Sequence, residues 1–283
     1  MRKPEWLRVK PKYSEDYNQI QRDLTEYGLY TVCQGARCPN QGECWAEGTA
    51  TFMLMGHTCT RNCGFCSVKT AKEGEPLNPK EAKNIALISK KWNLKYAVLT
   101  SVDRDDLPDY GAGHFADCIR SVKSAGILCE ALIPDFRADA DQLIKIIDAK
   151  PDVVAHNIEV VERLSPEMRD FKANYNQSLE VLKMFKKIAP DIYTKSGIML
   201  GLGETEIEIS DAMDDLRQVK VDLLTIGQYL QPTKQNAEVV EYIHPDKFKE
   251  YEKLGLKKGF KAVASAPFVR SSYKAAEIYS KLQ

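Results

Sequence analysis

Residues 51–66 read TFMLMGHTCTRNCGFC, an apolar run that leads straight into three cysteines. The run Thr51–Met55 has the length and composition of a buried strand. Cys59, Cys63 and Cys66 follow in a C-x3-C-x2-C spacing, with an aromatic residue before the last one. A strand that ends in three closely spaced thiols predicts a metal-binding or cluster-binding loop at the end of that strand.

The middle of the chain repeats the pattern of a strand followed by a helix. Further strands are predicted at Tyr96–Thr100, Cys129–Pro134, Val153–Glu159, Thr194–Leu200 and Leu223–Leu230. Amphipathic helices are predicted at Pro79–Trp92, Gly113–Ala125, Asp139–Ala149, Asn176–Ala189 and Glu204–Val219. Six strand–helix alternations predict an α/β fold with a parallel sheet, a partial (β/α)6 TIM-like barrel.

This alternation also predicts the domain organisation. Residues 49–235 would form the barrel. Residues 1–48 would be an N-terminal extension, and residues 236–283 a C-terminal extension with a helix. Both extensions are expected to pack on the barrel.

Composition narrows the possible partners and the compartment. The 283 residues include 40 Lys and Arg and 40 Asp and Glu, so the formal net charge is zero. This balance leaves no excess of positive charge that would indicate binding to nucleic acid or to an anionic membrane surface. The N-terminus lacks the apolar core of a secretory signal, and no run approaches the ~18 apolar residues of a membrane span. We therefore expect a cytoplasmic protein, where clustered cysteines more often bind metal than form disulfides.

Polar residues recur where the predicted strands end. The run Asp103–Asp106 follows the second strand, Asn157 and Glu159 lie near the end of the fourth, and Lys195 lies in the fifth. Gly201–Glu204 follows the fifth strand. Because barrel active sites gather at the carboxyl ends of strands, these residues are expected to face one site.

A second cysteine triplet, Cys33, Cys38 and Cys44, precedes the barrel in a C-x4-C-x5-C spacing. Three thiolates leave one iron of a cubane cluster without a protein sulfur. A zinc site is the alternative for each triplet, with His57 as a nearby fourth ligand for the later one. An electron-relay cluster is a further possibility for the earlier triplet.

The motif around Cys59, Cys63 and Cys66 resembles that of the radical S-adenosylmethionine superfamily, and the whole chain resembles the lipoyl synthase family. Matching segments are RKPEWL (2–7), CPN (38–40), EC (43–44), GTATFM (48–53), TSVDRDDL (100–107), HFADC (114–118), PDFR (134–137), HN (156–157), TKSG (194–197), GLGET (201–205), GQYLQP (227–232) and RSSY (270–273).

The resemblance implies a sulfurtransferase with two [4Fe–4S] clusters. Cys59, Cys63 and Cys66 would hold the catalytic cluster, whose open iron binds S-adenosylmethionine. Cys33, Cys38 and Cys44 would hold an auxiliary cluster with Ser272 of the RSSY motif as its fourth ligand. Members insert two sulfurs from the auxiliary cluster at C6 and C8 of a protein-bound octanoyl-lysine, and use two S-adenosylmethionine molecules for each lipoyl group.

The resemblance also implies partners. These are octanoylated carrier domains of 2-oxoacid dehydrogenases or the glycine cleavage H protein, a low-potential donor such as ferredoxin or flavodoxin, and iron–sulfur assembly proteins. Three alternative functions remain open for the chain. They are another radical enzyme with a biotin-synthase-like substrate, a non-enzymatic iron–sulfur electron carrier, and a zinc-stabilised binding module.

Six residues are candidate contacts for S-adenosylmethionine: Asn157, Glu159, Lys195, Gly201, Gly203 and Arg104. Helix caps or barrel-lining salt bridges are the alternative roles for Asn157, Glu159 and Lys195. Glycine pairs also make ordinary strand-to-helix turns, and Arg104 could belong to a solvated charge run. Cys118 and Cys129 are expected to be buried packing residues.

Overall fold

A computed structural model describes residues 3–8, 15–32, 40, 44, 49–280 and 282. An eight-stranded sheet forms the centre, in the order β1-β2-β5-β6-β7-β8-β9-β10. Its strands are β1 (Tyr30–Thr31), β2 (Thr49–Leu54), β5 (Tyr96–Ser101), β6 (Leu128–Leu132), β7 (Val153–Ala155), β8 (Tyr193–Leu200), β9 (Leu223–Gln228) and β10 (Ala262–Ser265). The strands from β2 to β10 pair in parallel, and β1 pairs antiparallel with β2. The expected parallel core of six strands is confirmed.

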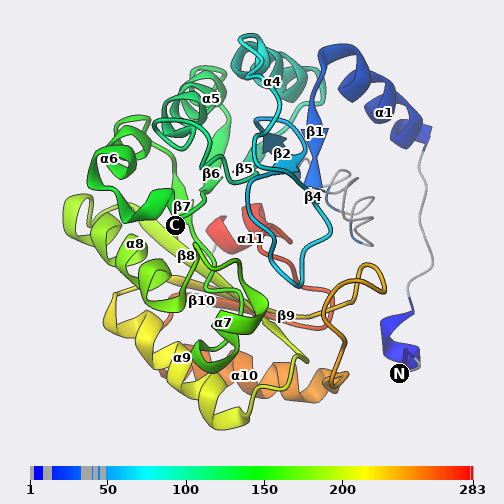
Figure 1. Cartoon of the computed structure of the whole chain (residues 1–283), viewed down its shortest axis with the longest axis vertical. Helices are drawn as coiled ribbons and strands as arrows, with labels where there is room; N and C mark the ends of the chain where they lie inside the picture. The colour runs from blue at the N-terminus through cyan, green and yellow to red at the C-terminus, as the bar shows by residue number, and fades with distance from the viewer. Residues whose placement is uncertain are drawn as a thin grey trace.

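Helices cover the outer face of the curved sheet (Figure 1). They are α4 (Glu81–Lys91), α5 (Ala112–Ser124), α6 (Ala140–Asp148), α8 (Tyr175–Ile188), α9 (Glu206–Gln218) and α10 (Pro245–Lys257). The shorter or peripheral elements are η1 (Glu5–Leu7), α1 (Glu15–Tyr27), β3 (Thr58–Cys59), β4 (Lys69–Thr70), η2 (Phe136–Ala138), η3 (Glu162–Leu164), α7 (Ser165–Met168) and α11 (Ala275–Ser280).

Alternating side chains divide each strand between two environments. Ala97 and Leu99 of β5 pack in the main core beneath the outer helices. Tyr96 and Val98 face the other side, where they pack against Ala275 of α11. Successive strand residues point to opposite faces, so the barrel has an outer core and a separately filled interior.

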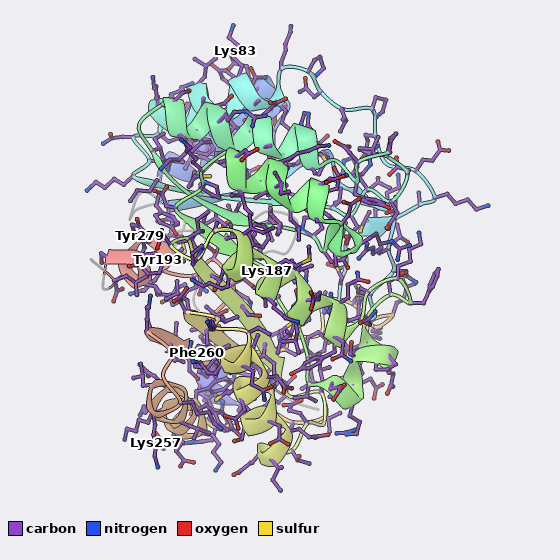
Figure 2. All side chains as sticks on the ribbon, turned by 90° about the vertical axis from the view of Figure 1, so that its left-hand side faces the viewer. Lys83, Lys187, Tyr193, Lys257, Phe260 and Tyr279 are labelled. Carbon is purple, nitrogen blue, oxygen red and sulfur yellow. The ribbon has the colours of Figure 1, made fainter. Side chains whose placement is uncertain are left out.

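The C-terminal helix α11 lies inside the curve of the sheet (Figure 1). Ile278 packs with Val153, Leu223 and Ala262, one residue from each of three strands. The rings of Tyr193 and Tyr279 meet edge to face with centroids 6.1 Å apart (Figure 2). Helix α11, near the end of the chain, thus fills the barrel interior.

Strand β10 was not predicted from the sequence. It lies in the segment that was assigned to the C-terminal extension. It pairs in parallel with β9, with Ala262 opposite Leu223. Its sequence, AVAS, is short and made of small residues, and therefore gives a weak strand signal. The small side chains suit a strand that borders the space occupied by α11.

No described helix is both long and apolar enough to cross a membrane.

Candidate functional site: the cysteine loop and the barrel mouth

Backbone amides point at all three sulfurs of the loop that follows β2. The Cys59 sulfur accepts from the N–H groups of Arg61 (3.4 Å) and Asp103 (3.3 Å). The Cys63 sulfur accepts from the N–H of Asp170 (3.3 Å), and the Cys66 sulfur accepts from that of Val68 (3.5 Å). Burial raises the pKa of the Cys59 and Cys63 thiols to about 12. Such thiols release their protons when they bind a metal. The amides would stabilise the resulting thiolates, so this donor set fits an iron–sulfur cluster.

The loop does not assemble a compact zinc site. A single zinc ion would hold its sulfurs about 2.3 Å from itself. Among the described residues, only Glu81, His114 and Cys118 bring three potential ligand atoms within 4.8 Å of one another. His57, the suggested zinc ligand, instead pairs with Glu75 at 3.2 Å. The sulfurs of Cys59, Cys63 and Cys66 are therefore not gathered within 4.8 Å around a position for a single ion.

Arg61, between the first two cysteines of the loop, is the centre of a buried ion network. Its guanidinium donates to Asp105 at 2.9 and 3.0 Å and to Asp135 at 2.8 Å. Asp103 lies 3.3 Å away. Hydrogen bonds from Arg61 overcome the effect of burial and lower the pKa of Asp135 to about 2, whereas burial raises that of Asp103 to about 6. A forked arginine thus fixes the loop to the ends of β5 and β6.

Both backbone polar groups of Met55, where the chain turns from β2 into the loop, bond to side chains. Met55 has a left-handed backbone, with φ of 65°. Its N–H donates to the Glu81 carboxylate at 3.1 Å, which also bonds His114 at 2.6 Å. The Arg104 guanidinium donates to the Met55 carbonyl at 3.4 Å and pairs with Asp106 at 2.8 Å. Arg104 therefore holds the turn in this structure, and its contact with a cofactor stays a prediction.

The residues beyond β7 meet the C-terminal segment at the barrel mouth. The Asn157 amide donates to Glu159 at 3.1 Å and to the Ser271 hydroxyl at 2.7 Å. Its buried Oδ1 has no hydrogen-bond partner among the described residues. Burial raises the pKa of Glu159, whose backbone has a φ of 68°. An unsatisfied oxygen beside a carboxylate and a strained residue fits a site for a polar cofactor.

A small cavity opens beside Asn157. Its volume is about 70 Å³, and Glu159, Met199 and Ser271 line it. A Cβ atom at Gly197 would lie 2.8 Å from Asn157 Oδ1 and from Thr225 Oγ1. The glycine in TKSG therefore leaves room for the Asn157 amide and the Thr225 hydroxyl at the wall of this cavity.

Lys195 lies deeper in the barrel than the cavity, two residues before Gly197 on β8. Its ammonium pairs with Glu130 at 2.8 Å, and both side chains are 1 % exposed. The Tyr96 hydroxyl donates to the same carboxylate at 3.0 Å. This is the barrel-lining pair that the sequence left open as an alternative. A cofactor contact for Lys195 stays a prediction.

The two glycines after β8 differ in their surroundings. Gly201 has a φ of 101°, and its N–H donates to the Glu204 carboxylate. A Cβ there would collide with the Gln228 amide and the Glu241 carbonyl. Gly203 has a φ of 100° and lies in the open. Both conformations favour glycine. Because glycine has no side chain, Gly201 and Gly203 could contact S-adenosylmethionine only through their backbone atoms, and that contact stays a prediction.

The first cysteine triplet is only partly within the described residues. Cys33 and Cys38 lie outside them, whereas Cys44 is half-buried. Asn40 is buried, and its amide donates to the Phe268 carbonyl at 2.6 Å. Ser272 follows in the turn before α11, where its carbonyl accepts from the Ala275 amide. The segment of the first triplet thus contacts the segment that leads to Ser272.

Several positioning residues were not singled out from the sequence. Asp135 comes from the PDFR motif, and Asp170 donates to Cys63 through its backbone. Asn236 donates to the Cys66 carbonyl at 2.7 Å. Arg61 was visible as a cation inside the motif, but its partners were not. Cys118 and Cys129 are fully buried, as expected.

The comparisons with known proteins agree with this geometry. Residues 53–216 match the radical SAM superfamily. The chain is 49 % identical to the lipoyl synthase of Methanocella arvoryzae, over 98 % of this chain and 94 % of that one. It belongs to the lipoyl synthase family. It is 52 % identical to the Anaeromyxobacter relative over 98 % and 95 % of the chains, and 49 % identical to the mitochondrial one of Branchiostoma floridae over 99 % and 77 %.

Solved structures support the fold alone. Methylornithine synthase superposes with a TM-score of 0.59 over 85 % of this chain and 73 % of its own, at 13 % identity. The FeFe-hydrogenase maturase of Carboxydothermus hydrogenoformans gives 0.62 over 95 % and 69 %, at 14 % identity. Both likenesses agree with the partial barrel.

Proposed function

We propose that this protein inserts two sulfur atoms, at C6 and C8, into an octanoyl chain carried on a lysine of a carrier domain. About 50 % identity to lipoyl synthases over nearly the whole chain supports the activity. The two carbons are unactivated, so no side-chain base could remove their protons. S-adenosylmethionine bound to a reduced cluster supplies the carbon radical that removes hydrogen atoms instead. Two molecules are consumed for each lipoyl group.

The residues of this chain would divide the work between two [4Fe–4S] clusters. Cys59, Cys63 and Cys66 would hold the cluster that binds S-adenosylmethionine. Asn157 and Glu159 would bind that cofactor's polar groups, since the free Asn157 Oδ1 can accept and the Glu159 carboxylate can pair with an ammonium. The filled barrel interior would exclude water from the reacting carbons.

Cys33, Cys38, Cys44 and Ser272 would hold the second cluster, the source of sulfur. One observation carries this assignment: the Asn40 amide bonds the Phe268 carbonyl at 2.6 Å. It joins the first triplet's segment to the RSSY segment. Ser271, next to Ser272, bonds Asn157 at 2.7 Å. The same short stretch therefore touches both halves of the site, as a shared substrate space between two clusters requires.

The reaction can be tested directly. The reconstituted protein should contain about eight irons, four for each cubane. Incubated without oxygen with an octanoyl-lysine peptide, S-adenosylmethionine and dithionite, it should give a product with two added sulfurs by mass spectrometry. Zinc in place of iron would remove the proposal. An unchanged peptide beside 5′-deoxyadenosine would favour the alternative of another radical SAM sulfur-inserting enzyme.

Single substitutions should separate the two clusters. Cys59→Ala should lose about four irons and all 5′-deoxyadenosine. Cys33→Ala should also lose about four irons but keep cofactor cleavage and lose sulfur insertion. Equal losses of cleavage in both variants would contradict the division of labour.

The role of Ser272 needs its own test, because an alkoxide is a harder ligand than a thiolate and matches iron less well. We propose that this weak corner lets the auxiliary cluster open and release sulfide. Ser272→Cys should keep about eight irons but lose sulfur insertion. Ser271→Ala is the matched control for the neighbouring hydroxyl and should retain the auxiliary cluster. Full sulfur insertion by Ser272→Cys would refute the weak-corner idea.

The partners follow from the proposed activity. The substrates would be octanoylated domains of 2-oxoacid dehydrogenases or the glycine cleavage H protein. A ferredoxin or flavodoxin would supply electrons, and assembly proteins would rebuild the consumed cluster. A cytoplasmic location stays a prediction, since relatives of similar identity are named mitochondrial and apicoplast.

A further inference from the structure

A hollow of about 400 Å³ lies against the outside of the cysteine loop. Thr60, Arg61 and Asn62 line one part of it, and residues 70–72, Asp170 and Lys172 line the rest. It shares no lining residue with the cavity beside Asn157. The hollow against the loop is therefore a separate space from the cavity beside Asn157.

Phe171 adjoins the hollow and is 88 % exposed, the highest value among the described large hydrophobic residues. The Lys172 ammonium lies 5.8 Å from the centre of its ring. A single exposed apolar side chain needs no explanation by itself. Phenylalanine is, however, among the residues that are enriched in protein interfaces relative to the rest of the surface.

Charges around the hollow are sorted by depth. The carboxylates of Asp105 and Asp135 are buried and paired with Arg61. The Asp170 carboxylate accepts from the backbone N–H of Asn62 at 2.9 Å. Lys72 is exposed, whereas the Lys172 ammonium is partly exposed and lies 3.6 Å from the Asp105 carboxylate. The rim therefore presents the Lys72 ammonium and an aromatic ring, beside the Lys172–Asp105 pair and the Asp170 carboxylate.

The backbone next to Phe171 leads directly to the cluster loop. The N–H of Asp170 donates to the Cys63 sulfur at 3.3 Å. A protein in contact with Phe171 would thus be one residue and one hydrogen bond from a cluster ligand.

We propose that an acidic one-electron carrier protein docks on the donor face, defined as Asn62, Lys72, Phe171 and Lys172. This inference rests on the proposed function, which needs an external electron. The carrier is oxidised by one electron and the cluster beside Cys63 is reduced by one, with no bond or proton exchanged. Opposite charges would steer the encounter. Small interfaces are usual for such transient redox pairs.

The acylated carrier domain is the competing occupant of this face. Its octanoyl chain must reach the Asn157 and Ser271 side of the loop, which has its own cavity. The donor face lies outside that cavity. The geometry therefore favours the electron donor.

The test uses the reconstituted enzyme, with an acidic flavodoxin as the probe. Phe171→Ser and Lys72→Glu should each weaken binding of oxidised flavodoxin about tenfold or more by calorimetry, and the wild-type affinity should fall as salt rises. Both variants should need correspondingly more reduced flavodoxin for 5′-deoxyadenosine formation. Rates with dithionite should stay within about twofold of wild type.

Matched controls lie on distant helices. Ile207, on α9, is 73 % exposed, and Ile207→Ser controls for loss of an apolar side chain. Lys187→Glu controls for charge reversal, because Lys187 projects from the outer helices (Figure 2). Neither should change flavodoxin binding.

Three outcomes would overturn the donor face. These are unchanged flavodoxin binding in Phe171→Ser and Lys72→Glu, an equal effect in the controls, or weakened binding of an octanoylated carrier domain instead. Failure of the wild type to cleave S-adenosylmethionine with dithionite would refute the proposed function. Flavodoxin binding would still decide the docking proposal in that case.

Discussion

Arg61 and Lys195 are both buried cations, but their carboxylate partners hold them in different settings. Arg61 sits on a loop and joins it to the ends of β5 and β6 through a planar fork. Lys195 sits on a strand and pairs with Glu130 across the barrel interior. Backbone pairing through β7 already joins the two strands that carry Lys195 and Glu130, whereas Arg61 links a loop to two strand ends through side chains. The comparison suggests that one ion pair positions a cofactor and the other fills a lumen.

The largest expected effect comes from Arg61→Lys. Lysine keeps the charge but loses the fork that spans Asp105 and Asp135. We expect iron content to fall by about four per chain and 5′-deoxyadenosine formation with dithionite to fall at least about 100-fold, or about 2.7 kcal/mol. Iron analysis and product chromatography would measure these losses.

Arg163→Lys is the matched control, since Arg163 forks onto Glu208 at the surface. Exposed pairs contribute little, so activity should hardly change. If Arg61→Lys kept its cluster, Arg61 would be no more important for positioning than Lys195.

A smaller effect, on stability, is expected from Lys195→Met. The substitution leaves the Glu130 carboxylate buried without its cation, which costs about 3–5 kcal/mol in comparable cases. The double variant Lys195→Met with Glu130→Gln should recover most of that loss. Denaturant unfolding would measure both.

The double variant also tests the predicted cofactor role of Lys195. If Lys195 contacts S-adenosylmethionine, the recovered protein will still bind the cofactor at least about tenfold more weakly, or 1.4 kcal/mol. Normal binding would restrict Lys195 to the barrel interior. A double variant as unstable as the single one would refute the pairing argument.

The smallest effect concerns His156, which lies near the Arg61 network. Burial, with nearby Arg169, lowers the pKa of His156 to about 4. Its Nδ1 bonds the Ile133 carbonyl and its Nε2 bonds Ser178, which fits a neutral ring. Below about pH 6.5 His156 is protonated in the unfolded chain but stays neutral in the folded chain. Stability is therefore lost as pH falls from about 6.5 to 4, by at most about 1.4 kcal/mol per pH unit.

Unfolding free energies between pH 7 and pH 5 would measure this slope. His156→Gln should flatten it, whereas His244→Gln, at an exposed helix cap, should not. An unchanged slope in His156→Gln would place the pH dependence in other groups, such as the Arg61 network itself.

Periodic features of the sequence predicted most of the fold. The strand runs and helix stripes match β2, β5 to β9 and the helices α4, α5, α6, α8 and α9, because burial on one face leaves a regular trace. The short strand β10 and the interior helix α11 left no such trace. Their packing depends on the shape of a lumen that forms only after the sheet curves.

Long-range pairing limited the prediction of the site. The thiol spacing identified the cysteine loop because its ligands are local in sequence. The partners of Arg61 come from the ends of two other strands. Asp170 acts through its backbone, which no residue type reveals. Lys195 was singled out by its position, but only the structure shows Glu130 opposite it.

The placement of α11 has a consequence for how the chain is made. Synthesis runs from the N-terminus, so β5 emerges well before the helix that packs on Tyr96 and Val98. Until then, these side chains face an empty lumen. Contacts between such distant segments slow folding and leave apolar surface exposed meanwhile. The barrel can be completed only late, and the nascent chain is a natural client for chaperones during that interval.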